Sequence, residues 1–144
     1  MEQKKVFIVH GHDTPALFEL DNLLTKDFHL NTIVLSQMPS RGSPALIDKF
    51  EREASSASYA FVLLTPDDIV EKDDGEYLQA RPNVLFELGW FCGRLGRDKV
   101  CIMRKKGTQI PSDLFGVLYI EFEEKIVDKY RELRNELNEA RLIN

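Results

Sequence analysis

The chain has 144 residues, of which 43% are hydrophobic and 30% are charged, and its formal net charge is −5. This composition indicates a water-soluble globular protein, and the negative charge argues against a general nucleic-acid binder, which needs a basic face to meet phosphates. No apolar run approaches the ~20 residues of a membrane span, and the N-terminus lacks a signal-peptide pattern. We therefore expect a cytoplasmic protein with one domain over residues 1–144, of a size that also occurs as an excerpt of longer multidomain chains.

Apolar periodicity predicts nine elements along the chain. In chain order they are strand 5–9, helix 14–28, strand 31–36, helix 45–55, strand 59–64, helix 82–95, strand 99–103, strand 117–120 and helix 123–142. Thr14 and Ser43 are predicted as helix N-caps, because each precedes a proline that suits a first helical turn. Residues 69–80 are polar and irregular and are predicted to form a long loop, and long loops in compact domains often carry function.

Five buried strands that alternate with helices predict a parallel α/β sheet with helices on both faces. The expected strand order is 2-1-3-4-5, which reverses between the first and third strands. Ligands of such sheets bind beyond the carboxyl ends of the strands at that reversal. The polar side chains expected to converge there are those of His10, His12, Asp13, Thr65, Asp67, Asp68, Arg81, Asn83 and Glu87.

Several familiar kinds of site lack their sequence motifs in this chain. It has neither a GxxxxGK[ST] phosphate loop nor a GxGxxG turn after a strand. His10, His12 and Asp13 are metal-ligand types, but without a further His or Cys cluster this spacing does not indicate a metal site, and we expect none. A phosphoacceptor receiver would have an aspartate directly after the third strand, where this chain has Thr65.

The predicted helix in residues 81–96 (RPNVLFELGWFCGRLG) combines a carboxylate with unexpected glycines. Glu87 lies in its most apolar part, on one stripe with Asn83 at the boundary of the predicted core. The helix dipole alone would favour a carboxylate in these first turns. Gly89 and Gly93 each cost about 1 kcal/mol relative to alanine, which suggests that a strand, a helix or a ligand approaches closely beside Glu87. A carboxylate beside such a groove can stabilise an oxocarbenium-like transition state at a glycosidic bond.

Four stretches of the chain carry a family resemblance: VFIVHGHD, ALIDKFEREASSASYAFVLLTPDD, RPNVLFELGWFCGRLGR and PSDLFGVLY. They resemble the bacterial TIR-like family of predicted nucleotide-binding domains, which includes TIR domains fused to STING domains in anti-phage signalling systems. The resemblance implies a flavodoxin-like five-stranded sheet and hydrolysis of NAD⁺ at the nicotinamide–ribose bond, with Glu87 as the catalytic glutamate. It implies no cofactor, because NAD⁺ is the substrate.

The resemblance also implies roles for the segments around Glu87. The residues that would line or rim the NAD⁺ pocket are His10, Gly11, His12, Asp13, Thr65, Asp67, Asp68, Arg81 and Asn83. The loop at residues 36–43, with Met38, Arg41 and Gly42, would contact a neighbouring protomer, so that the active form is an oligomer or filament. A fused or partner sensor domain is also expected, whereas a nucleic acid or membrane partner is not.

Two other functions fit the same residues. A nucleoside deoxyribosyltransferase-like enzyme uses a carboxylate on a related fold and would act on nucleosides instead of NAD⁺. A TIR module without enzymatic activity would serve only as an assembly scaffold. An assay with NAD⁺, with nucleosides and with buffer alone separates the three.

Overall fold

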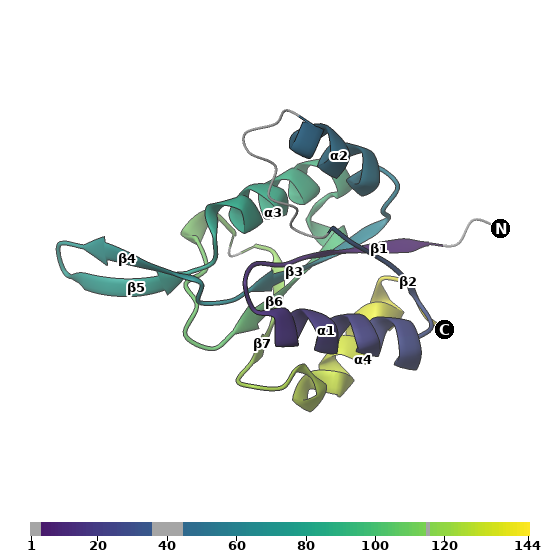
Figure 1. The fold of residues 1–144 in the computed structure, drawn as a ribbon. Coiled ribbons are helices and arrows are strands. Elements are labelled where there is room, and N and C mark those ends of the chain that lie inside the picture. The colour runs from purple at the N-terminus through teal and green to yellow at the C-terminus, as the bar shows by residue number, and fades with distance from the viewer. Residues whose placement is uncertain (1–3, 36–44, 115) are drawn as a thin grey trace.

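The computed structural model describes residues 4–35, 45–114 and 116–144, which form a parallel sheet between two layers of helices (Figure 1). The strands of the sheet are β1 (Lys5–Val9), β2 (Asn31–Val34), β3 (Tyr59–Leu64), β6 (Val100–Lys105) and β7 (Leu118–Phe122). Their order is β2-β1-β3-β6-β7, and each neighbouring pair is parallel. The predicted α/β class and the reversal of order between β1 and β3 are confirmed.

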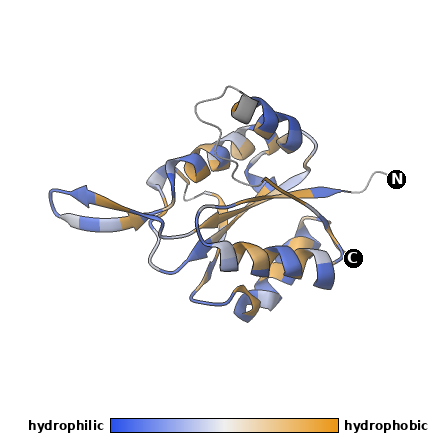
Figure 2. Cartoon of the chain, in the orientation of Figure 1, coloured by the Kyte–Doolittle hydropathy of each residue, from blue (hydrophilic) through white to orange (hydrophobic). Residues whose placement is uncertain are grey.

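The central strand β3 is buried along its whole length, as expected for six apolar residues without polar alternation. Because successive side chains point to opposite faces of a sheet, β3 contributes to two apolar layers. One layer holds Phe61 with the helices α1 (Thr14–Asn22) and α4 (Tyr130–Glu139). The other holds Val62 with α2 (Ala45–Ala54) and α3 (Pro82–Leu95). Figure 2 shows the hydrophobic residues concentrated between these helical layers.

Two predicted helices differ from the structure near their ends. The N-cap of α1 is Asp13, whose Oδ1 accepts a hydrogen bond from the Ala16 amide at 3.0 Å, so the prediction of Thr14 as the cap was wrong by one residue. The helix then continues as a π-helical turn, Leu23–Asp27. The C-terminal helix is shorter than predicted, because a 3-10 turn at Ile126–Lys129 precedes α4. Further 3-10 turns lie at Arg97–Lys99 and Ser112–Leu114.

Polar contacts at both ends hold the last helical segment on the sheet. The Glu19 carboxylate of α1 accepts hydrogen bonds from the amides of Ile126 at 2.6 Å and Val127 at 3.3 Å, at the start of the 3-10 turn. Further along, the buried Tyr59 hydroxyl of β3 donates to Glu136 Oε1 at 2.5 Å. The segment from the 3-10 turn through α4 is therefore an integral part of the domain.

The stretch predicted as an irregular loop is instead a β-hairpin, so that prediction was wrong. The antiparallel strands β4 (Asp68–Lys72) and β5 (Gly75–Gln79) form it, and Gly75 turns the chain at a φ of 136°, which favours glycine. The hairpin is connected to the rest of the domain by a hydrogen bond from the Gln109 amide to the Leu78 carbonyl oxygen, at 2.8 Å. Figure 1 shows it projecting away from the rest of the molecule.

Within the described ranges, no helix has both the length and the apolar character needed to cross a membrane. The predicted N-cap Ser43 and the predicted contact loop, with Met38, Arg41 and Gly42, lie outside these ranges.

Candidate functional site

Three of the predicted site residues, His12, Thr65 and Arg81, are joined through a fourth, Asp67, where the carboxyl ends of β1 and β3 meet the first turn of α3. Asp67 Oδ1 accepts hydrogen bonds from the Thr65 hydroxyl at 2.8 Å and the His12 amide at 3.4 Å. Asp67 Oδ2 accepts one from the Arg81 amide at 3.3 Å. One carboxylate therefore ties the loop after β1 to the loop after β3 and to the N-cap of α3.

Gly11 is explained by the same carboxylate. A Cβ atom at residue 11 would overlap Asp67 Oδ2 and lie 3.0 Å from Asp67 Cγ. The φ of Gly11 is not positive, so the backbone conformation itself does not require glycine. The structure thus gives Gly11 and Asp67 a structural role that their prediction as NAD⁺ contacts did not include.

Asp13 is also engaged with the protein. In addition to capping α1, its Oδ2 lies 2.8 Å from the Nζ of Lys105 at the end of β6. Burial alone would raise the pKa of Asp13, but the bonds from Lys105 and the Ala16 amide outweigh it and lower the pKa. The sequence prediction missed Lys105 because it ended that strand at residue 103. The predicted strand order could have indicated the contact between Lys105 and Asp13, since it places the carboxyl ends of β1 and β6 on either side of β3.

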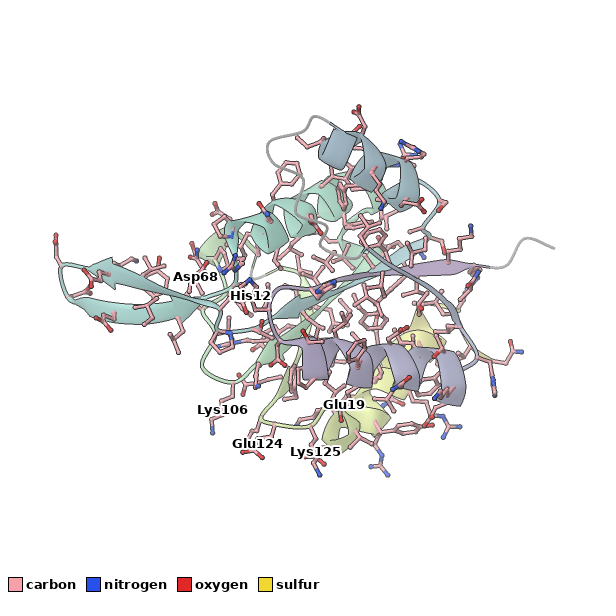
Figure 3. All side chains as sticks on the ribbon, in the orientation of Figure 1. His12, Glu19, Asp68, Lys106, Glu124 and Lys125 are labelled. Carbon is pink, nitrogen blue, oxygen red and sulfur yellow. The ribbon has the colours of Figure 1, made fainter. Side chains whose placement is uncertain are left out.

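Arg81 and Asp68 form the outer part of the site, at the base of the hairpin. The Nε of Arg81 lies 4.0 Å from Asp68 Oδ1, and both side chains are about two-fifths exposed. This Nε is inaccessible to solvent, and no hydrogen-bond acceptor for it lies within the described part of the chain. Figure 3 places His12 and Asp68 at the same end of the molecule. Arg81 therefore lies at the base of the hairpin beside Asp68, and its predicted contact with NAD⁺ stays a prediction.

The two histidines of the loop after β1 differ in their surroundings. The His12 side chain is exposed. The half-buried ring of His10 has Nδ1 3.1 Å from Gly11 O and Nε2 3.2 Å from Leu35 O, which connects this loop to the end of β2. The described residues contain no group of three or more His, Cys, Asp or Glu side chains placed to hold a metal ion.

Glu87 lies on α3 two turns from the Asp67 network. It follows Arg81 by six residues, which is roughly 9 Å of helical rise. Leu88 faces the core, while Glu87 is on the flank of the helix that also carries Trp90, whose ring packs against Phe50 of α2 at 5.2 Å. Asn83, one turn before Glu87 on this flank, is exposed. The catalytic candidate Glu87 is therefore half-buried, on the same flank of α3 as the Trp90 ring that contacts α2.

The environment of the Glu87 carboxyl favours its neutral form. Burial raises the pKa of Glu87 to about 7, from an ordinary value of 4.5. Glu87 has neither a hydrogen bond nor an ion pair with another described residue. A carboxyl group that changes its charge near neutral pH and is not used to hold the fold together is typical of functional sites.

The glycines of α3 do not lie beside Glu87, contrary to the prediction. At about 100° per residue, Gly89 is roughly 200° around the helix from Glu87. A Cβ atom at Gly89 or Gly93 would have no described atom within 4 Å. The predicted close approach from within the domain is therefore absent from the described residues. The side of α3 that carries Gly89 and Gly93 faces solvent.

Comparison with known proteins agrees with the fold. A family model described as "CAP12/Pycsar effector protein, TIR domain" matches residues 5–124. The chain is 48% identical over 123 residues to the uncharacterized protein YuaY of Escherichia coli K12, which covers 84% of this chain and 40% of YuaY. It is 32% identical over 149 residues to protein tirC of Dictyostelium discoideum, which covers 95% of this chain and 71% of tirC. It is 29% identical over 123 residues to the Pycsar effector protein BcPycTIR of Burkholderia cepacia. This match covers 84% of this chain and 41% of BcPycTIR. The chain thus spans about two-fifths of the length of YuaY and of BcPycTIR.

Proposed function

Because this chain belongs to the TIR-domain family of CAP12/Pycsar effectors, we propose that it hydrolyses NAD⁺ at the nicotinamide–ribose bond as an effector of anti-phage defence. In this reaction a water oxygen bonds to the anomeric carbon of the ribose as the bond from that carbon to the nicotinamide nitrogen breaks. The electron pair of the broken bond leaves with nicotinamide, which departs neutral, and the proton of the water goes to solvent. The leaving group therefore needs no general acid.

The observation that carries the proposal is the half-buried carboxyl of Glu87, with its raised pKa and no bond to another described residue. When NAD⁺ loses nicotinamide, positive charge grows on the anomeric carbon and the ring oxygen. An ionised carboxylate stabilises that charge more strongly at a partly desolvated position than in bulk water. A pKa near 7 supports this role, since a large share of Glu87 is ionised at neutral pH.

The surrounding segments support the proposal through positioning and charge. Asp67 fixes the N-cap of α3, and through the helix it fixes the place of Glu87. The guanidinium of Arg81 is suited to bind the diphosphate of the substrate, because a guanidinium matches phosphate geometry. In this proposal Glu87 is the catalytic residue and Asp67 is a positioning residue.

We also propose that self-association activates the domain and that a sensor domain accompanies it. YuaY and BcPycTIR are more than twice as long as the region that this chain matches, which supports a further domain in such proteins. Because Met38, Arg41 and Gly42 lie outside the described residues, this proposal draws its support from the family.

The experiment is to incubate the purified chain with NAD⁺, with nucleosides or with buffer alone over a wide range of protein concentrations, and to separate the products by chromatography. We expect release of nicotinamide from NAD⁺, with an activity per molecule that rises with concentration. Glu87→Gln should abolish this release, whereas the matched change Glu51→Gln on the exposed side of α2 should not. Cleavage of nucleosides but not NAD⁺ would indicate a deoxyribosyltransferase-like enzyme. No cleavage at any concentration would indicate a scaffold.

A further inference from the structure

The hairpin of β4 and β5 exposes apolar side chains that its own domain covers only in part. Ile69 and Leu78 are directly opposite each other across the two strands, so they share one face. They are 65% and 38% exposed. Because an isolated two-stranded hairpin is only marginally stable in water, an apolar face of this kind gains from packing against another surface.

The tip of the hairpin (residues 71–76) is acidic. It contains the four carboxylates of Glu71, Asp73, Asp74 and Glu76 and the single cation Lys72, and all of these side chains are exposed. The ammonium of Lys72 lies 5.0 Å from the ring centroid of Tyr77. None of the four carboxylates has an ion-pair partner among the residues that the structure describes.

A basic hollow lies on the outer side of α4. It has a volume of about 530 Å³ and is lined by Tyr130, Arg131, Arg134, Asn135 and Asn138. This lining contains two arginines and no carboxylate, and neither arginine is paired with a carboxylate in the described ranges. The Tyr130 ring is held in place because it stacks on Phe28, with ring centroids 5.0 Å apart. The α4 hollow thus offers positive charge beside a fixed aromatic ring.

The acidic tip cannot reach the α4 hollow of its own chain, because the hairpin projects away from α4 (Figure 1). We propose that the hairpin of one copy docks into the α4 hollow of a second copy of this chain. This inference rests on the self-association in the proposed function and names the surfaces that carry it. Tip and hollow are different surfaces, so the contact is heterologous, and repeated contacts build an open chain of protomers or a ring.

The opposite charges of the acidic tip and the α4 hollow are the reason for proposing a second copy of this chain as the partner. The four carboxylates of the tip would face the guanidinium groups of Arg131 and Arg134, with Ile69 and Leu78 packing beside the Tyr130 ring. Attraction between opposite charges steers association and disfavours wrong partners. Such attraction is screened by salt, since the Debye length falls from about 10 Å at 0.1 M to about 3 Å at 1 M ionic strength. Self-association should therefore weaken as salt is added.

The test is a charge-reversal cycle, followed by sedimentation velocity in the absence of NAD⁺. The tip variant carries Asp73→Lys and Asp74→Lys, and the hollow variant carries Arg131→Glu and Arg134→Glu. Each variant alone brings like charges together, so we expect the protein concentration at half-assembly to rise about tenfold or more. The chain with all four changes pairs a basic tip with an acidic hollow, so its assembly should return toward that of the wild type. An equimolar mixture of the two variants should also assemble.

The control is Lys49→Glu with Arg52→Glu, which reverses two positive charges on α2, at the opposite face of the sheet, and should leave assembly unchanged. All substituted tip and hollow side chains are exposed, and melting curves will verify that the variants fold. A wild-type chain that stays monomeric at all concentrations, or a four-change chain that assembles no better than the two-change variants, would overturn the inference. Assembly rescued as described but without NAD⁺ cleavage would leave this inference standing and refute the proposed activity alone.

Discussion

The carboxylate of Asp67 fills the space that a side chain on Gly11 would need. The loop after β1 and the loop after β3 are far apart in the sequence, and they therefore pack directly against each other at the carboxyl edge of the sheet. The same carboxylate accepts bonds from the Thr65 hydroxyl and the Arg81 amide. The conformation of the two loops at this edge of the sheet therefore depends on the contact between Gly11 and Asp67.

Gly11→Ala should destabilise the protein by about 1–3 kcal/mol, because the added methyl group displaces the Asp67 carboxylate. In an Asp67→Ala background the same change should cost much less, since the oxygens it displaces are gone. Urea denaturation of the wild type, both single variants and the double variant gives the coupling free energy, which we expect to be about 0.5–3 kcal/mol. Strictly additive effects would show that the two residues do not compete for this space.

Glu87→Gln should stabilise the protein above neutral pH. Burial raises the pKa of Glu87 to about 7, from 4.5, so the folded state keeps a proton that the unfolded state releases between these pH values. Wild-type stability therefore falls as the pH rises through this window, whereas glutamine does not titrate. At about pH 8 the variant should be more stable by up to about 3 kcal/mol, and below about pH 4.5 the difference should vanish. Urea denaturation across this range measures it, with Glu51→Gln as the exposed control.

The rate of NAD⁺ cleavage should follow the ionisation of the same group. If the carboxylate form of Glu87 is the active one, kcat/KM should rise with pH and level off above about pH 7. Well below that value it should fall by about tenfold for each pH unit. Initial rates at low NAD⁺ concentration, at pH values where melting curves show a folded protein, test this expectation. A flat profile from about pH 5.5 to 8 would exclude Glu87 as the ionising group.

Gly93→Ala should stabilise the protein by up to about 1 kcal/mol, because alanine is the better helix former and no described atom lies near the new methyl group. Gly89→Ala is the matched variant on the same exposed flank of α3. Thermal melting measures the effect, and NAD⁺ cleavage measured in parallel shows whether this flank is used between molecules. Reduced stability would mean that something in the folded domain does approach this flank.

The features predicted correctly from the sequence depend on burial. Runs such as 59–64 have no polar alternation because both of their faces are covered, and this pattern alone indicated strands of a parallel sheet. The hairpin was missed because Glu71, Lys72 and Glu76 lie in its exposed strands and hide any alternation typical of a half-buried ribbon.

The contacts inside the candidate site could not be predicted in the same way. Gly11 and Asp67 are 56 residues apart, and no local pattern links a glycine to the carboxylate that occupies its side-chain space. The spacing of Gly89 and Gly93 indicated a shared helix face, but not that this face points to solvent. The half-burial of Glu87 could be predicted because its position at the core boundary can be read along one helix, whereas its catalytic role stays a prediction.

The anchoring of α4 has a consequence for how the domain can be dissected. The family match ends at residue 124, whereas Leu133 and Leu137 of α4 are fully buried. A fragment cut at residue 124 would lack the helix that shields Tyr59 and Phe61 on one face of the sheet. Uncovered apolar surface of this extent favours aggregation, so such a fragment would precipitate and could be mistaken for an inactive domain. Expression boundaries should therefore extend past the Leu142 and Ile143 side chains, which pack against the same layer.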